Sequence, residues 1–229
     1  MRWGFGRTRY SIAPGLYAIG SPSGDSPVLV TANYKMTFDI LRRDMYGHDV
    51  WIMVIDTKGI NVWCAAGKGT FSTDEIVRQV ERAKLQDVVK HRTLILPQLG
   101  APGVAAHEVT KACGFKVVYG PVRSSDLPEF IDTGNRPTPL MRRVPFVLGD
   151  RLVLTPVELV HMWRHFLYSI VALFLVGVIG PEIFSLSAAW SRGGAAIATG
   201  IMALLTGAVI TPILLPWVPG RAFAKKGAI

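Results

Sequence analysis

The chain has 229 residues, of which 50% are hydrophobic, 18% are charged and two are cysteines, and its formal net charge is +9. Two cysteines are too few for a disulfide framework and are typical of a protein in a reducing compartment. Residues 1–27 contain scattered arginines, prolines and glycines but no continuous apolar run. They do not resemble a secretory signal, so we expect the segment that follows to stay in the cytoplasm.

Residues 28–155 alternate between short apolar runs and longer segments with helical periodicity. The apolar runs are "PVLVTAN", "VWIMVIDT", "RTLILPQL" and "FKVVYGPV", and the helical segments are "MTFDILRRDMYG", "STDEIVRQVERAKLQDVVKH" and "GVAAHEVTKACG". This alternation predicts an α/β domain with a largely parallel sheet, preceded by an N-terminal extension of residues 1–27. Ligands of such sheets bind at the carboxyl ends of the strands. We therefore expect a site among "TANYKMT", "DTKGINVWCAAGK", "PQLGAPG" and "GPVRSSD".

Two helix starts carry the capping-box pattern, Ser72 with Glu75 and Thr155 with Glu158. The second of these helices continues without a breaker into the apolar C-terminal region. Before it, "VPFVLGDRLVLTP" predicts a hairpin around Gly149 and Asp150.

Residues 156–229 are predicted to form a membrane domain. "FLYSIVALFLVGVIG" and "GGAAIATGIMALLTGAVITPILLPWVPG" carry no charge, and a spanning helix needs roughly 17–25 predominantly apolar residues. We expect two antiparallel spans, roughly residues 163–183 and 194–217, in the lipid bilayer of the cell inner membrane. Because basic residues precede the first span and follow the second, both the α/β domain and the C-terminal segment should be cytoplasmic. This distribution accounts for much of the net charge, so no nucleic-acid partner is predicted.

The segment "NVWCAAGKGTF", residues 61–71, places one cysteine among small and apolar neighbours. A phosphate loop needs glycine five residues before its Gly-Lys pair and Ser or Thr directly after it, and this chain has Val62 and Gly69 there. No cysteine or histidine stands at zinc-ligand spacing from Cys64. A nucleophilic cysteine with a distant histidine and a buried core cysteine both remain open. A third hypothesis is a short helix with an alanine and glycine face that lets a large flat molecule approach the backbone and the sulfur.

Three side chains of the C-terminal region lie on one face of the predicted helix: Glu158, His161 and His165. Such spacing can bind a metal, but side chains of this kind also collect at a membrane interface, which is the interpretation we favour. Cys113 precedes Gly114 at the end of an amphipathic segment and is interpreted as a core residue.

The cysteine segment is similar to the signature of the membrane-anchored corrinoid protein family of microbial mercury methylation, known as HgcA. The flanking "VLVTANYKMTFDILR", "HRTLILPQLGAPGVAAHEV", "GFKVVYGPVRSSDLPEF" and "DRLVLTPVELV" also resemble that family. The resemblance covers residues 28–165 closely and the two apolar runs more loosely. It implies a Rossmann-like corrinoid-binding domain followed by transmembrane helices. Because the family has more membrane helices than the two predicted here, we expect the membrane domain of this chain to be incomplete.

The resemblance also implies the cofactor and its ligands. The cofactor would be a base-off corrinoid of the cobalamin type, with the thiolate of Cys64 as the lower axial ligand of cobalt. The residues implied to contact it are Thr31 and Thr37 at the corrin rim and Asn61, Val62, Trp63, Cys64, Ala65, Ala66, Gly67 and Lys68 in a cap helix. The Gly100–Gly103 turn and the Gly120–Ser125 loop are weaker candidates for contacts with the corrin edge. An Asp-x-His-x-x-Gly motif, which would supply a histidine ligand, is absent from the sequence.

The function implied by the resemblance is corrinoid-dependent methyl transfer. The enzyme would move a methyl group from methyl-cobalt(III) corrinoid to inorganic mercury(II) and form methylmercury. The implied partners are a ferredoxin-like protein with two 4Fe–4S clusters, resembling HgcB, and an upstream methyl donor, either a protein or a methyl-folate. Two alternatives are a membrane-tethered corrinoid methyl carrier with an acceptor other than mercury, and a membrane-anchored cysteine hydrolase that binds no corrinoid.

Overall fold

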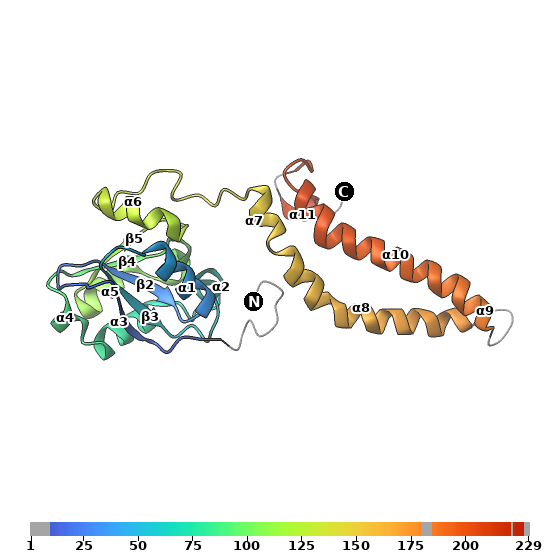
Figure 1. Cartoon of the computed structure of the whole chain (residues 1–229), viewed down its shortest axis with the longest axis horizontal. Coiled ribbons are helices and arrows are strands. Elements are labelled where there is room, and N and C mark those ends of the chain that lie inside the picture. The colour runs from blue at the N-terminus through green and yellow to red at the C-terminus, as the bar shows by residue number, and fades with distance from the viewer. Residues whose placement is uncertain (1–9, 180–184, 221, 227–229) are drawn as a thin grey trace. The chain divides into compact units, whose positions relative to one another are not determined.

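The computed structural model describes residues 10–179, 185–220 and 222–226 (Figure 1). Contacts between Cα atoms divide these residues into two compact units, one ending at Val144 and the other beginning at Pro145. Each unit is described by itself.

The first unit is built on a five-stranded sheet in the order β1-β3-β2-β4-β5. Its strands are β1 (Gly15–Ile19), β2 (Val28–Ala32), β3 (Val50–Ile55), β4 (Thr93–Leu96) and β5 (Lys116–Tyr119). The pairs β2–β3, β2–β4 and β4–β5 are parallel, which confirms the predicted parallel sheet. Strand β1 pairs antiparallel with β3, with Gly15 opposite Val54 and Ile19 opposite Val50. The sheet therefore reaches into the range assigned to an N-terminal extension.

Helices cover both faces of this sheet, so the unit has three layers. The helical elements are α1 (Lys35–Asp44), α2 (Val62–Gly67), α3 (Thr73–Arg82), α4 (Leu85–Val88), η1 (Gln98–Gly103), α5 (Ala106–Cys113), η2 (Ser124–Asp126) and α6 (Leu127–Asp132). One core packs α1 and α6 against the sheet through residues such as Phe38 and Phe130, both buried. The other core packs α2, α3, α4 and α5 through residues such as Phe71, Ile76 and Val109. This arrangement confirms the predicted α/β class.

The helix predicted over residues 72–91 begins as expected but does not continue. Ser72 Oγ accepts a hydrogen bond from the Glu75 backbone N–H at 3.3 Å, as the capping pattern predicts. The helix then ends at Arg82, and Lys84 adopts a left-handed conformation with φ of 44°. This turn starts α4, whose first residue, Leu85, is fully buried. Burial of that leucine stabilises a break that helical periodicity alone does not predict.

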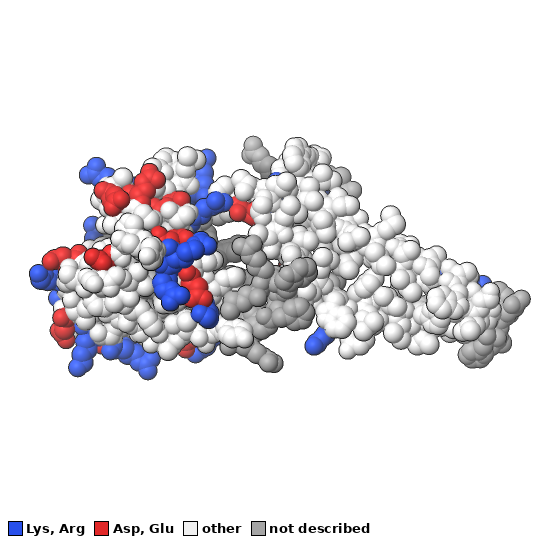
Figure 2. All heavy atoms as spheres, in the orientation of Figure 1, with Lys and Arg blue, Asp and Glu red and all other residues white. Residues whose placement is uncertain are grey.

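The second unit contains two long apolar helical stretches. Its elements are α7 (Leu148–Leu152), α8 (Thr155–Val178), α9 (Leu186–Ala188), η3 (Ala189–Gly193), α10 (Gly194–Leu205), η4 (Thr206–Ile210), α11 (Thr211–Leu214) and α12 (Phe223–Lys226). The stretches Leu148–Val178 and Ala189–Leu214, of mean hydropathy 1.5 and 2.0, are long and apolar enough to cross a membrane. On the face shown in Figure 2, charged side chains gather on the first unit and are sparse on the second. Residues 180–183 of the first predicted span lie outside the described residues.

The predicted hairpin around Gly149 and Asp150 is wrong, because the structure forms α7 there. Contacts of the Arg151 side chain with α11 hold this helix in place. The buried guanidinium donates from Nη1 to the carbonyl oxygens of Pro212 at 3.0 Å and Ile213 at 2.5 Å. A cation is favourable at the carbonyl end of a helix, so Arg151 joins α7 to the end of α11.

Candidate functional site

The order of the strands creates a topological switch point at β2. The connection through α1 leads from β2 to β3 on one side, whereas β4 pairs with β2 on the other side. In open α/β sheets, the crevice outside the carboxyl ends of such strands is where ligands bind. A cavity of about 300 Å³ lies there. It is lined by Leu29, Val30, Thr31, Thr37, Ile40, Leu41, Asn61, Val62, Trp63, Ile95, Leu96, Pro97, Leu99, Pro121, Val122, Ser124 and Leu127.

The short helix α2 forms one rim of this cavity, and its first turn is held by a side-chain cap. Asn61 has an extended backbone and accepts, through Oδ1, a hydrogen bond from the Cys64 backbone N–H at 2.9 Å. An asparagine cap of this kind stabilises a helix by about 1 kcal/mol. Asn61, Val62 and Trp63, which the family resemblance implied as contact residues, all line the cavity.

The thiol of Cys64 lies on the outer face of α2. Cys64 is a free and exposed cysteine, and Trp63 beside it is 67% exposed. Gly67, one turn later, is also exposed, and a Cβ built on it would have no heavy atom within 4 Å. Cys64 is not among the residues that line the cavity, so its sulfur stands on an open surface next to the rim. The interpretation of Cys64 as a core cysteine is therefore wrong.

The two alanines of the cap helix have a different place from the one proposed for them. Ala65 and Ala66 are 0% and 6% exposed, so their side chains face the core and not the open surface. A Cβ on Gly103 would lie 3.0 Å from the Cα of Ala66 and 2.2 Å from the carbonyl oxygen of Phe71. The small residues thus let η1 pack closely behind α2. The open face of the helix is formed by Trp63, Cys64, Gly67 and Lys68.

The other predicted contact residues divide into two groups. Thr31 in β2 and Thr37 in α1 line the cavity, and so do Pro121, Val122 and Ser124 of the predicted Gly120–Ser125 loop. The glycines at positions 100 and 103 instead face Phe71 and Ala66 behind the cap helix. Lys68 is the C-terminal cap of α2, and its backbone N–H donates to the Cys64 carbonyl at 3.1 Å.

Several lining residues were missed by the sequence analysis, among them Ile40, Leu99 and Leu127. All three are apolar, and none was named as a contact residue, although Leu99 lies within the segment "PQLGAPG" where a site was expected. Their position next to strand ends, after "TANYKMT" and within "PQLGAPG", was the signal available for the first two.

Cys113, the other cysteine, does not line this cavity. Cys113 is partly buried against the core, and its Sγ donates to the Val109 carbonyl oxygen at 3.2 Å. Burial is the main cause that raises the pKa of the Cys113 thiol above its usual value. Among the residues that the structure describes, no three His, Cys, Asp or Glu side chains converge in a way that could hold a metal ion. The exposed Glu158, His161 and His165 of α8 therefore form no such cluster.

Comparison with protein families assigns the first unit. Residues 6–131 match the family model CdhD, described as the CO dehydrogenase/acetyl-CoA synthase delta subunit. The chain belongs to this family. The CdhD match contains Cys64 and every residue that lines the cavity, whereas the apolar stretches of the second unit lie outside it.

Curated relatives of this CdhD-family chain match the same region. The acetyl-CoA decarbonylase/synthase complex subunit gamma of Methanopyrus kandleri is 36% identical over 128 residues, which are 55% of this chain and 27% of the relative. The subunits gamma of Archaeoglobus fulgidus and Methanocaldococcus jannaschii are 30% and 32% identical over 128 and 127 residues, again 55% of this chain, and 27% and 26% of the relatives. The chain thus spans about a quarter of the length of these relatives.

The corrinoid implied by the sequence resemblance can be tested against this geometry. A corrin is flat and largely apolar, and it needs an open surface beside a mostly apolar cavity and a ligand atom that can reach its metal. The exposed thiol of Cys64, the unfilled space at Gly67 and the apolar cavity rim at Val62 and Trp63 meet these needs. The residues of α2 and of the cavity rim therefore fit a corrinoid.

Proposed function

We propose that the first unit binds a corrinoid across the open face of α2 and carries a methyl group for transfer to an acceptor. The observation that carries this proposal is the exposed Cys64 beside the cavity at the switch point of the sheet, inside the segment that matches the CdhD family. When bound, a corrinoid would supply a cobalt centre that accepts and releases a methyl group.

The residues of α2 have separate roles in this proposal. Asn61 caps the helix and so orients the turn that contains Cys64. Cys64 would offer a soft, strongly donating sulfur to the metal of a bound corrinoid, which would increase the electron density available for methyl transfer. Trp63 and the apolar cavity rim shield one side of the site from water, and Gly67 leaves space for a ring to approach the backbone.

The identity of the molecule that accepts the methyl group is a separate part of the proposal. The curated relatives are named as subunits of acetyl-CoA decarbonylase/synthase complexes, which favours the broader function of a methyl carrier. We infer inorganic mercury(II) as the acceptor because the segment "NVWCAAGKGTF" resembles the mercury-methylation signature. Its exposed thiol also provides the ligand which that chemistry uses.

The partners and location follow from this inference. A ferredoxin-like protein with two 4Fe–4S clusters would return electrons after each transfer, and a methyl donor protein or methyl-folate would reload the site. The two apolar stretches of the second unit would anchor the chain in the cell inner membrane, with the corrinoid domain in the cytoplasm.

The first experiment is reconstitution of the detergent-purified chain with hydroxocobalamin, followed by gel filtration and visible absorption spectroscopy. We expect a coloured protein whose spectrum changes in Cys64→Ala and stays unchanged in Cys113→Ala, because Cys113 packs against the core. A colourless wild-type protein would exclude both the carrier and the mercury proposals. Retention of corrinoid with identical spectra in wild type and Cys64→Ala would exclude sulfur ligation.

An assay of methylmercury formation distinguishes mercury(II) from a different methyl acceptor. The same chain, with reduced ferredoxin-type partner, a methylated corrinoid and thiol-bound mercury(II), should produce methylmercury. Corrinoid retention without methylmercury under these conditions would support the methyl carrier with a different acceptor.

A further inference from the structure

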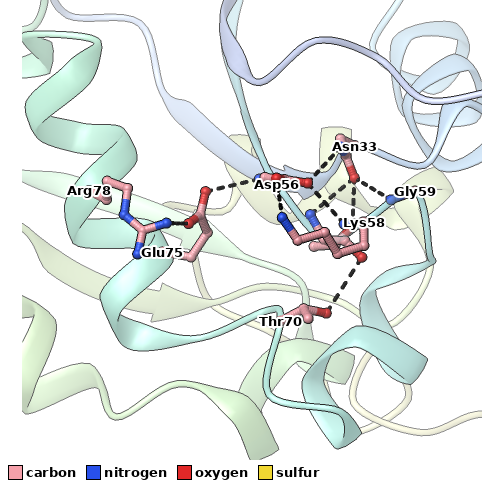
Figure 3. Close-up of polar contacts among 8 residues, drawn as sticks. Asn33, Asp56, Lys58, Gly59, Thr70, Glu75 and Arg78 are labelled. Carbon is pink, nitrogen blue, oxygen red and sulfur yellow. Dashed lines mark hydrogen bonds and ion pairs between the residues drawn. The ribbon is translucent and has the colours of Figure 1, made fainter.

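The loop that leads from β3 to the cap helix is bound to a buried asparagine at the end of β2. Asn33 is 5% exposed, and its Oδ1 accepts from the backbone N–H groups of Thr57 at 3.0 Å and Gly59 at 2.9 Å. Its Nδ2 donates to Asp56 Oδ1 at 3.1 Å. Figure 3 shows these contacts converging on one side chain. A single residue directly after β2 thus organises the loop of residues 56–60.

Asp56 extends this network toward α3. Its carboxylate also accepts from the Lys58 backbone N–H and from Lys58 Nζ, both at 2.9 Å. Its own backbone N–H donates to Glu75 Oε1 at 3.1 Å, and Glu75 is only 6% exposed and paired with Arg78. The hydrogen bonds from Lys58 are the main cause that lowers the pKa of Asp56 below its usual value. The carboxylate is therefore ionised at neutral pH and remains an acceptor.

The backbone of this loop needs such support because it is unusual. Lys58 and Gly59 have φ angles of 60° and 71°, in the left-handed region that a lysine rarely adopts. Strained positions of this kind persist only where surrounding contacts over-determine them. Here the contacts are the Asn33 and Asp56 hydrogen bonds to the amides of Thr57, Lys58 and Gly59.

The far end of α2 returns to the same loop. Thr70 Oγ1 lies 3.5 Å from the Thr57 carbonyl oxygen and 3.4 Å from the Ala65 carbonyl oxygen, and the Thr70 backbone N–H donates to Ala65 at 2.9 Å. The cap helix is therefore connected to the loop at its beginning by the chain and at its end by Thr70.

We propose that Asn33 is a positioning residue, which together with Asp56 clamps the loop of residues 56–60 and so holds α2 with Cys64 at the cavity rim before any cofactor binds. The relevance of this clamp to methyl transfer rests on the proposed function. The clamp itself predicts that the cap helix is already formed in the cofactor-free chain.

The test exchanges the two polar side chains. Asn33→Asp keeps the acceptor for Thr57 and Gly59 but places a carboxylate against the carboxylate of Asp56, so it should open the loop. The double variant Asn33→Asp with Asp56→Asn restores one donor and one acceptor between the two positions. Asp25→Asn removes one negative charge from an exposed ion pair with Lys90 and is the matched control for Asp56→Asn.

The readout is amide hydrogen exchange of residues 61–67 in the cofactor-free, detergent-purified full chain, with residues 106–113 as the internal reference. We expect exchange in α2 to rise about tenfold or more in Asn33→Asp, and to return to within about threefold of wild type in the double variant. The control and the reference helix should not change.

Two results would overturn the clamp: α2 exchange in Asn33→Asp equal to that of wild type, or no recovery in the double variant. If Asn33→Asp alone does not fold, a folded double variant with wild-type exchange supports the clamp, and an unfolded one overturns it. Corrinoid retention by the wild type is measured separately. A colourless wild-type protein would therefore refute the proposed function without deciding the clamp.

Discussion

The two cysteines of this chain lie in short helices of the same α/β unit, yet their environments are opposite. Cys64 follows the carboxyl end of β3, is exposed and stands next to the cavity. Cys113 lies at the end of α5, is partly buried, and donates its thiol hydrogen to the Val109 carbonyl oxygen. The residue type is the same, so the chemistry is decided by position relative to the switch point of the sheet.

Replacement of the two cysteines should give the largest difference. Cys64→Ala removes the proposed axial ligand and is expected to lower methyl transfer to mercury by about a hundredfold or more. Cys64→His should also be strongly impaired, because imidazole donates less charge than a thiolate and extends further from the helix. The rate of methylmercury formation is measured for both variants after reconstitution with the corrinoid. Cys113→Ala is the control that should retain activity. Wild-type rates in both Cys64 variants would reject the ligand assignment.

A methyl group on either side of the cap helix should have opposite effects. Gly103→Ala places a Cβ 2.2 Å from the Phe71 carbonyl oxygen and is expected to lower the free energy of unfolding by about 1–3 kcal/mol. Gly67→Ala meets no atom within 4 Å and should be neutral or stabilising by up to about 1 kcal/mol, because alanine favours a helix. It should nevertheless weaken corrinoid retention, since it fills the open face. Denaturant unfolding and cobalamin binding are the measurements; equal stability of the two variants would contradict this account of η1.

Loss of the helix cap should affect α2 and leave α5 intact. Asn61→Ala removes the hydrogen bond to the Cys64 amide and is expected to cost about 1 kcal/mol, whereas Asn61→Asp retains an acceptor and should cost less. Amide exchange of residues 62–67 reports the effect directly. Unchanged exchange in the alanine variant would show that the cap does not stabilise this helix.

The smallest effect concerns the pH dependence of stability at Cys113. Because burial raises the pKa of this thiol in the folded state, the folded protein favours the protonated form. The protein should therefore lose stability as the pH rises above the unfolded-state pKa of the thiol, about 8.5. Cys113→Ala should reduce this loss slightly when unfolding is compared at neutral and alkaline pH, and Cys64→Ala is the control. A steeper loss in Cys113→Ala than in the wild type would contradict the assignment.

Much of the fold could be predicted because the relevant signals are local. Apolar runs bounded by turn residues predicted the four parallel strands, and the Ser72 and Glu75 pattern predicted the start of α3. The same local reasoning predicted a site among the segments that follow the strand ends, and Thr37 and Asn61 lie in two of them. These two residues were singled out only by the family resemblance. The family-specific role of Cys64 depended on the resemblance and remains a proposal.

Local signals in the sequence therefore predicted the order of the four parallel strands, the cap of α3 and the edge of the sheet where a site should lie, because each depends on residues a few positions apart. The capping box predicted at Thr155 is wrong, because α8 begins at Thr155 itself and has no side-chain cap. Contacts between distant segments were needed to show that β1 completes the sheet, that Ala65 and Ala66 face inward, and that Gly103 packs against Ala66. They also decided the role of Asn33, whose side chain contacts residues more than twenty positions away. Such contacts join segments distant in the chain, and no periodicity or spacing along the sequence encodes which of them meet.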